Sequence, residues 1–380
     1  MASPEPRRLT VVQLLPALES GGVERSTLEI ADALVRAGHR AIVVSAGGRL
    51  VPSLLALGGE HVELAIGRKS PATLRHAFAL RRLWAAQNVD LVHARSRLPA
   101  WAGLLAWRGL AEDARPHFVT TVHGLNSPSR YSAVMTRGER VICVSETVRD
   151  YVLQHYPDTD PARLRTIPRG IDPAAFPRAS WPDPEARAWA AATHPALGGD
   201  GPLLLLPGRG TRLKGHADAL SLLAALRGDG RDARLWLPGA REAGREAYIA
   251  ELEQQAQALG IAEAVAFTAP TEAIARAYAA SDLVLQLSRK PEAFGRTVVE
   301  AWSCGRAVLG WNHGGVGELL ARSQPSGAVA PFDGGALHRA ACELLTHAPP
   351  AVDTMAFSLR AMQEATLAVY AELVDGAGRG

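Results

Sequence analysis

The sequence predicts an α/β protein made of two doubly wound parallel sheets in series. Short apolar runs alternate with segments of helical length, the alternation stops over residues 171–201, and it then starts again. Runs that are apolar on both faces are typical of parallel strands covered by helices on both sides. The interruption is rich in Pro, Asp and Gly and contains one short helical segment, which indicates a hinge or linker between two domains.

Six candidate strands precede this hinge and six follow it. The first six are LTVVQLLP (9–16), RAIVVSA (40–46), HVELAI (61–66), VDLVHA (89–94), HFVTTVH (117–123) and RVICVS (140–145). The last six are GPLLLLPG (201–208), ARLWLPGA (233–240), AVAFTA (264–269), DLVLQLS (282–288), RAVLGWN (306–312) and SGAVAP (326–331). The helical segment after the first strand ends near Gly38, because glycine tolerates the conformation that closes a helix.

A last helix is predicted for residues 354–376, after Pro349-Pro350. We expect residues 1–170 and this helix to form the first domain and residues 171–353 to form the second. Ligands of open parallel sheets bind at the carboxyl ends of the strands. With two such domains, we expect the site to lie in the cleft between them.

Composition excludes several classes of protein. The net charge is only +3, with 41 Lys and Arg against 38 Asp and Glu, which does not suggest a nucleic-acid binder. Cys143, Cys304 and Cys342 form no CxxC pair, so we expect reduced thiols that pack as small core residues. The start of the chain lacks the apolar region of a secretory signal, and no run reaches about 20 apolar residues. A cytoplasmic protein is expected, at most bound to a membrane surface.

Polar residues follow the strands of the first domain. Gly21 and Gly22 precede a helix, where free backbone amides would face an anion, although a simple tight turn is the alternative. The stretch is not GxGxxG and no acidic residue ends the second strand, which disfavours a nicotinamide oxidoreductase. Two successive strands then each end in a histidine with Arg or Asn nearby. These residues are His93, Arg95 and Arg97, then His123, Asn126 and Arg130; each histidine could instead be structural.

The second domain supplies cations and carboxylates. Arg209 and Lys214 lie in the loop after LLLLPG, where a guanidinium and an ammonium can hold a diphosphate. In PEAFGRTVVEA a helix begins near Gly295, and its free amides offer an anion site. Glu300 lies one turn inside this helix, where it can accept hydrogen bonds from a ribose. Glu292 precedes the helix and would project towards the far side of the phosphates. The combination suits a nucleotide sugar.

Taken together, these stretches resemble the retaining glycosyltransferases of the GT-B fold, specifically family four, also called glycosyl transferases group 1. The resemblance covers nearly the whole chain: SGGVERSTLEIADALVRAGH, TTVHG, RVICVSETVRDY, IPRGID, LLLLPGRGTRLKGH and PEAFGRTVVEAWSCGRAVLGWNHGGVGELL. The two glutamates separated by seven residues are its strongest element. One departure is Gly317, where the family often has proline before the glutamate.

The resemblance implies a fold of two Rossmann-like domains and a role for each motif. The first domain would bind the acceptor and the second the nucleotide-diphosphate sugar. The implied catalytic residues are His123, Arg209, Lys214 and Glu292. The implied donor-binding residues are Gly21, Gly22, Arg209, Lys214, Glu292, Phe294, Gly295, Arg296, Thr297 and Glu300. We expect His93, Arg95, Arg97, Asn126 and Arg130 to contact the acceptor.

No metal or other cofactor is expected. Asp158-Thr159-Asp160 matches a D-x-D metal motif, but its Pro-bounded position favours turn and cap aspartates. Basic and aromatic residues gather in the first domain, which suits an anionic headgroup or an ordinary solvated face. These residues are Arg68, Lys69, Arg75, His76, Arg81, Arg82 and Trp84, then Arg95, Arg97 and Trp101. VHARSRLPAW resembles members assigned to lipopolysaccharide core assembly, so such an acceptor is expected. The rival predictions are a sugar-nucleotide epimerase of related shape and a non-catalytic nucleotide-sugar binder.

Overall fold

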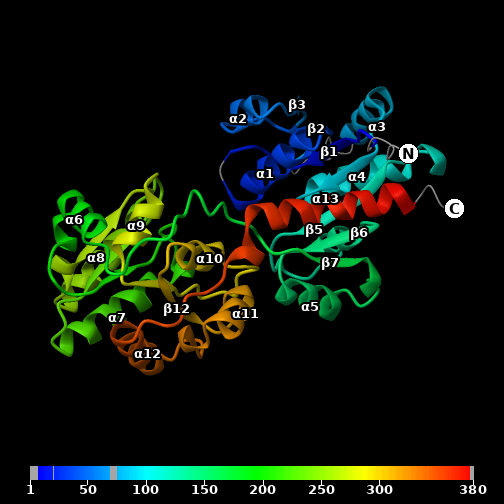
Figure 1. Ribbon diagram of the computed structural model, residues 1–380. Coiled ribbons are helices and arrows are strands. Elements are labelled where there is room, and N and C mark those ends of the chain that lie inside the picture. Colours follow the sequence, from blue (N-terminus) through cyan, green and yellow to red (C-terminus); the bar gives the residue numbers. More distant parts are fainter. Residues whose placement is uncertain (1–6, 20, 69–74, 377–380) are drawn as a thin grey trace, which may run out of the picture. The chain divides into compact units, whose positions relative to one another are not determined.

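The computed structural model describes residues 7–19, 21–68 and 75–376. The chain divides into two compact units, each with its own parallel sheet (Figure 1). The first unit comprises the chain up to Pro168 and the segment from Leu359, and the second comprises Arg169–Ser358. The polypeptide therefore returns to the first unit after it has completed the second.

The sheet of the first unit has seven strands in the order β3-β2-β1-β4-β5-β6-β7, all parallel. It is built from the apolar runs noted above, because their buried faces pack against helices on both sides. The short β7 was not among the predicted strands. The strands are β1 Thr10–Leu14, β2 Arg40–Ser45, β3 Glu60–Glu63, β4 Leu91–Ala94, β5 His117–Val122, β6 Arg140–Cys143 and β7 Leu164–Thr166.

One helix of the first unit comes from the end of the chain. α13 packs against α1, and its buried residues join the core formed by β1, β2 and α1. α13 begins five residues later than residue 354, because Met355–Phe357 form a 3-10 turn and Ser358 is extended. The helices are α1 Gly22–Arg36, α2 Val51–Ala56, α3 His76–Gln87, α4 Arg97–Arg108, α5 Glu146–His155 and α13 Leu359–Gly376.

The second unit has a six-stranded parallel sheet in the order β10-β9-β8-β11-β12-β13. All six strands predicted after the hinge are present, each shorter than its apolar run. The strands are β8 Leu203–Leu205, β9 Arg234–Pro238, β10 Val265–Thr268, β11 Leu283–Gln286, β12 Ala307–Trp311 and β13 Ala328–Val329. The helices are α6 Pro184–Thr193, α7 His216–Gly228, α8 Glu246–Ala258, α9 Ile274–Ala280, α10 Arg296–Ser303, α11 Gly314–Ser323 and α12 Gly334–Thr346.

The segment 171–201 packs into the second unit, which corrects the expectation of a linker, and the short helix expected within it is present as α6. It contains α6, which packs against α9, and its residue Leu197 is fully buried. Pro184 starts α6 and Asp183 caps it by accepting a hydrogen bond from the amide of Ala186. The Pro and Asp residues that indicated a linker therefore mark a helix start.

Both sheets have a point where the strand order reverses, and ligands of such folds bind there. In the first unit this point lies between β1 and β4, and in the second between β8 and β11. The loops that leave these four strands contain Gly21, Arg95, Arg209 and Glu292. The topology thus brings the predicted residues of each domain to the favoured edge of its own sheet.

Candidate active site

The loop after β8 presents two cations in different surroundings. Arg209 is exposed, and its guanidinium has no hydrogen-bond or ion-pair partner among the described residues. Lys214 ends the 3-10 turn Arg212–Lys214 just before α7. Gly215 follows with φ +76, and a Cβ there would lie 2.1 Å from the carbonyl oxygen of Leu287. Only glycine allows this loop to pass so close to the end of β11.

Lys214 and Glu292 meet in the second unit, although 78 residues separate them in sequence. The Lys214 Nζ donates to Glu292 Oε1 at 2.7 Å, and the two side chains are 29% and 26% exposed. The Ser288 hydroxyl donates to the same carboxylate oxygen. The cation predicted for the phosphates and the carboxylate predicted for the sugar therefore form an ion pair that solvent can reach.

The loop that carries Glu292 is hydrogen-bonded to the neighbouring loop after β12. The ring Nε2 of His313 lies 2.9 Å from the Ser288 carbonyl oxygen, and the Gly315 amide donates to the Glu292 carbonyl oxygen at 2.7 Å. A Cβ at Gly315 would lie 2.5 Å from the Phe294 Cα. His313 was not predicted as a site residue, although it follows a strand as His123 does.

Glu300 lies on α10, one turn after the capping residue Gly295. The Tyr278 hydroxyl donates to Glu300 Oε2 at 2.9 Å. Tyr278 is fully buried, and burial raises its pKa well above the usual value, so the hydroxyl stays protonated. The carboxylate is thereby held as an acceptor with a fixed orientation. Tyr278 lies 22 residues earlier on a different helix, and no motif in the sequence marked it.

The residues between the two glutamates have mixed environments. Phe294 is buried and its ring centroid lies 6.1 Å from that of Phe357. Arg296 donates to the Gly170 carbonyl oxygen at 3.0 Å. Thr297 is half-buried in the first turn of α10. Within the predicted donor site, the side chains of Phe294 and Arg296 thus make contacts inside the protein.

The first unit has a cavity of about 270 Å³ at the carboxyl ends of β4 and β5. Of the predicted residues, it brings together Arg95, Arg97, His123 and Asn126. Gly21 and Gly22 are exposed at the start of α1, whose next residue, Val23, lines the same cavity.

Arg95 is the most unusual residue of this cavity, because it is only 3% exposed. It donates to Gln13 Oε1 at 3.0 Å and to the Ser26 hydroxyl at 2.6 Å. Burial lowers its pKa to about 10, which still leaves the guanidinium charged at neutral pH. Its Nε has no hydrogen-bond partner among the described residues. A buried cation with neutral partners and a spare donor can bind an anion.

Two predicted acceptor residues lie elsewhere. His93 is fully buried, with Nδ1 2.6 Å from the Tyr370 hydroxyl and Nε2 2.6 Å from the Thr121 hydroxyl. It does not line the cavity, so its predicted contact with an acceptor is corrected to a packing role. Arg130 is exposed and lies outside the lining of the cavity. Arg97 donates to the Ser132 hydroxyl at 3.2 Å.

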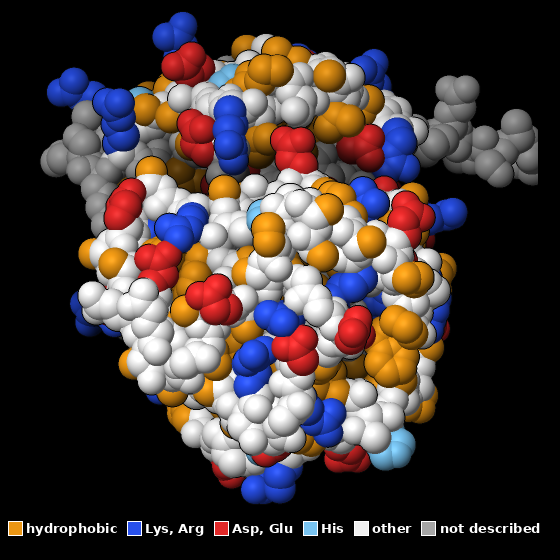
Figure 2. All heavy atoms as spheres, turned by 90° about the vertical axis from the view of Figure 1, so that its left-hand side faces the viewer, with side chains coloured by type: hydrophobic (Ala, Val, Ile, Leu, Met, Phe, Trp, Pro, Cys, Tyr) orange, Lys and Arg blue, Asp and Glu red, His pale blue; other side chains and the backbone are white. Residues whose placement is uncertain are grey.

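Two other predictions from the sequence concern the D-x-D stretch and the basic and aromatic residues of the first domain. Asp160 caps a 3-10 turn by accepting from the Ala162 amide at 2.9 Å, as its position indicated. Arg81 donates to the carbonyls of Leu105 and Ala106 near the end of α4, and Trp84 is buried, so neither belongs to a free basic surface. Arg75 and Arg82 are exposed, and Lys69 lies outside the described residues. On the face shown in Figure 2, acidic and basic side chains are interspersed.

A further cavity of about 240 Å³ in the second unit does not involve these residues. It lies between Asp282, Ala307 and Pro349, at the amino ends of β11 and β12. Ligands of parallel sheets bind at the opposite edge, so we assign the candidate site to the loops that carry Lys214, Glu292 and Glu300.

Comparison with known proteins finds two family models that match successive parts of the chain. Residues 20–175 match the family model Glycosyltransferase Family 4, and residues 192–351 match the model Glycosyl transferases group 1. A D-inositol 3-phosphate glycosyltransferase from Jonesia denitrificans is 30% identical over 177 residues, which is 45% of this chain and 40% of that protein. The matches span less than half of either curated relative.

Solved structures cover the chain more fully. A glycosyltransferase from Rickettsia africae is 28% identical with a TM-score of 0.84, and the match covers 97% of this chain and 99% of that one. Anabaena HepE, solved with UDP and glucose, is 20% identical with a TM-score of 0.80, covering 96% and 100% of the two chains.

Two parallel-sheet units with these neighbours define the GT-B fold, which confirms the predicted fold. Within that fold, residues 20–175 are similar to Glycosyltransferase Family 4 and residues 192–351 to Glycosyl transferases group 1. Among the described residues, no helix combines the length and the apolar character needed to cross a membrane.

Proposed function

We propose that the protein is a retaining hexosyltransferase that uses a nucleotide-diphosphate sugar as donor. The observation that carries this proposal is the paired arrangement of Lys214 with Glu292 and Tyr278 with Glu300 at one edge of the second sheet. Glu300 would accept hydrogen bonds from the ribose, and Glu292 would accept them from the sugar. HepE, which has the same fold, was solved with UDP and glucose, a pair of this chemical class.

The reaction needs positive charge where the diphosphate leaves. Lys214 would stabilise the developing charge on the phosphate, and the exposed Arg209 would close onto it from the same loop. Attack of the acceptor hydroxyl from the side of the leaving group retains the anomeric configuration, and the departing phosphate oxygen takes the acceptor proton. Glu292 is a poor candidate for a nucleophile, because its Oε1 already accepts hydrogen bonds from Lys214 and Ser288. The donor is proposed to bind without a metal.

The acceptor is proposed to be an anionic glycolipid or saccharide, with the lipopolysaccharide core as the first candidate. The cavity of the first unit supports an anionic group, because Arg95 and Arg97 line it and no Asp or Glu is among its lining residues. The relative from Jonesia denitrificans is named for D-inositol 3-phosphate, itself an anion. We propose that His123 lies beside the reacting sugar. Arg75 and Arg82 would provide contact with an anionic membrane surface on the cytoplasmic side.

The test separates donor binding from chemistry. The protein is incubated with UDP-, GDP- and ADP-sugars, and release of the nucleoside diphosphate is measured with and without acceptor glycolipids. Glu300→Ala should weaken donor binding about tenfold or more, because a charged hydrogen-bond acceptor is lost. Lys214→Ala should lower kcat about a hundredfold, because its charge acts mainly in the transition state.

Lys290→Ala is the matched control for this test, since Lys290 is an exposed lysine in the loop that carries Glu292. It should keep wild-type rates. Wild-type behaviour of both Glu300→Ala and Lys214→Ala would contradict the proposed site. An isomerised donor would instead indicate an epimerase, and donor binding without turnover a binding protein.

A further inference from the structure

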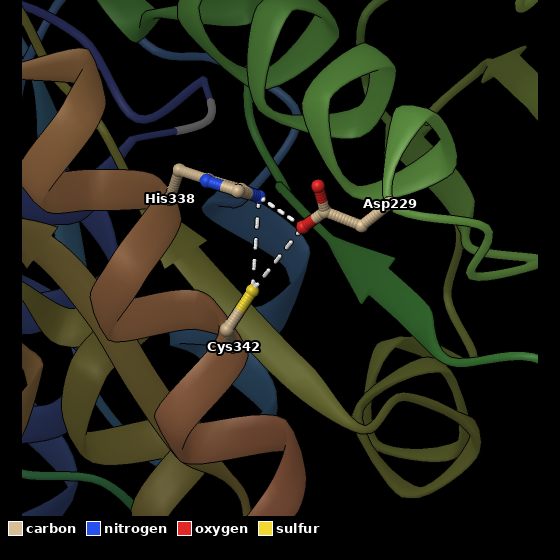
Figure 3. Close-up of side chains that lie close together, drawn as sticks. All are labelled: Asp229, His338 and Cys342. Carbon is tan, nitrogen blue, oxygen red and sulfur yellow. Dashed lines mark hydrogen bonds and ion pairs between the residues drawn. The ribbon is translucent and has the colours of Figure 1, made fainter.

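Three side chains capable of binding metal converge on the second unit, and none belongs to the candidate active site. Asp229 follows the last residue of α7, and His338 and Cys342 are four residues apart on α12. Residues at this spacing lie on the same face of a helix. Figure 3 shows the three side chains pointing towards one another across the gap between the two helices.

The distances between the ligand atoms are short. The His338 Nε2 lies 2.8 Å from Asp229 Oδ2. The Cys342 Sγ lies 3.8 Å from that oxygen and 3.7 Å from that nitrogen. A tetrahedral zinc site with bonds of about 2.0–2.3 Å places its ligand atoms roughly 3.3–3.6 Å apart. Both sulfur distances are already close to these values, and the nitrogen–oxygen pair would need to open by about 0.5 Å.

The chemistry of the three ligands is selective. Imidazole, thiolate and carboxylate are the groups that zinc prefers, and a thiolate disfavours magnesium and calcium. A purely structural role would account for the hydrogen bond between His338 and Asp229, which joins α12 to α7. Packing of Cys342 against the core places its thiol on this helix face, and the thiol adds a sulfur ligand within 4 Å of both partners. Cys342 is partly buried and packs against the core of the second unit, as predicted for the cysteines, while its thiol lies beside His338 and Asp229.

We propose that Asp229, His338 and Cys342 bind one Zn²⁺ ion, with a fourth position open to water. The site lies at the far end of α7 from Lys214, about 20 Å away along a helix of this length. The ion therefore takes no part in sugar transfer. It joins α7 to α12 and stabilises the second unit whenever zinc is bound. These ligands were not predicted from the sequence, because Asp229 lies more than 100 residues before His338 and Cys342.

The experiment uses the full-length protein without a histidine tag, after the removal of metals with a chelator. Co²⁺ is titrated first, because a bound thiolate gives a charge-transfer absorption that oxygen and nitrogen ligands do not give. We expect one Co²⁺ per chain with this absorption, and its displacement by Zn²⁺. Zn²⁺ should also raise the melting temperature of the wild-type protein.

Variants at the site distinguish a built site from surface binding. Cys342→Ser should abolish the charge-transfer absorption, and His338→Gln and Asp229→Asn should each weaken Zn²⁺ binding at least tenfold. His347→Gln is the control, because this exposed histidine caps the end of α12 outside the cluster. It should bind Zn²⁺ as the wild type does. Absence of the absorption, or an equal Zn²⁺ effect on melting in Cys342→Ser, would overturn the proposal.

Discussion

The orientation of a single carboxylate depends on a buried phenol. Tyr278 has no exposed surface, and its hydroxyl donates to Glu300 from beneath α10. Because burial keeps this hydroxyl neutral, it donates across the whole physiological pH range. One oxygen of Glu300 is occupied in this way, and the carboxylate is oriented before any ligand arrives. Such preorganisation reduces the entropy that donor binding costs.

Tyr278→Phe should therefore weaken donor binding while the fold is preserved. Loss of one hydrogen bond to a carboxylate is expected to cost about 1 kcal/mol, or roughly a fivefold rise in the donor Kd. Calorimetric titration with the preferred nucleotide sugar measures the change. Tyr248→Phe serves as the control, because Tyr248 lies on α8 and has no contact with Glu300. A donor Kd unchanged by Tyr278→Phe would mean that Glu300 does not bind the donor or needs no orientation.

At the residue scale, the sequence predicted which residues the candidate site would use better than it predicted the partners that their side chains contact. Lys214, Glu292 and Glu300 were selected by their spacing around loops and a helix start. The Lys214–Glu292 ion pair could not be predicted, because it depends on how two strand-exit loops approach each other. His93 was misjudged because it lies inside β4, where its side chain meets the hydroxyl of Tyr370, 277 residues later in the chain.

Among the elements, α13 brings the end of the chain into the core of the first unit. It packs against α1 and supplies Met362, Val369, Tyr370 and Leu373 to the core. Tyr370 is fully buried, and its hydroxyl forms a hydrogen bond of 2.6 Å with His93 Nδ1. The other ring nitrogen of His93, Nε2, forms a hydrogen bond with the Thr121 hydroxyl. Burial raises the pKa of Tyr370, so its hydroxyl is neutral. A polar link between a strand and a distant helix thus lies within an apolar core.

Tyr370→Phe should destabilise the protein by about 1–3 kcal/mol, because a buried ring nitrogen of His93 loses its partner. Urea unfolding followed by circular dichroism measures this loss. Tyr131→Phe is the comparison, since Tyr131 is 39% exposed and keeps its ring in the variant. Equal unfolding midpoints for the two variants would show that the His93 contact contributes nothing.

The strands were the most predictable elements, and the reason is physical. A parallel strand covered on both faces is apolar throughout, so each of the twelve runs was visible without any tertiary information. Strand β7 was missed because it has three residues, two of them the polar Arg165 and Thr166. The segment 171–201 was interpreted as a linker around one short helix, because the Pro and Asp residues that start a helix have the same composition as a linker.

On the scale of the whole molecule, the two units differ in how the chain builds them. The second unit is continuous, from Arg169 to Ser358. The first needs a segment from the far end of the chain before its core is complete. Burying four large side chains of α13 contributes about 6–12 kcal/mol by transfer free energies, as an upper estimate. That is comparable to the entire stability of an ordinary domain, about 5–15 kcal/mol.

Removal of α13 should therefore unfold the first unit and leave the second intact. In a chain that ends at Ser358, proteolysis should digest the residues before Pro168 and leave a resistant fragment that starts near Arg169. A fragment of residues 169–358 expressed alone should show a cooperative thermal transition, because its sheet and core lie within that segment. A chain ending at Gly376 controls for shortening, since it retains all of α13. If the chain ending at Ser358 resisted proteolysis throughout, the first unit would have to be stable without α13, and the energetic role given to that helix would be wrong.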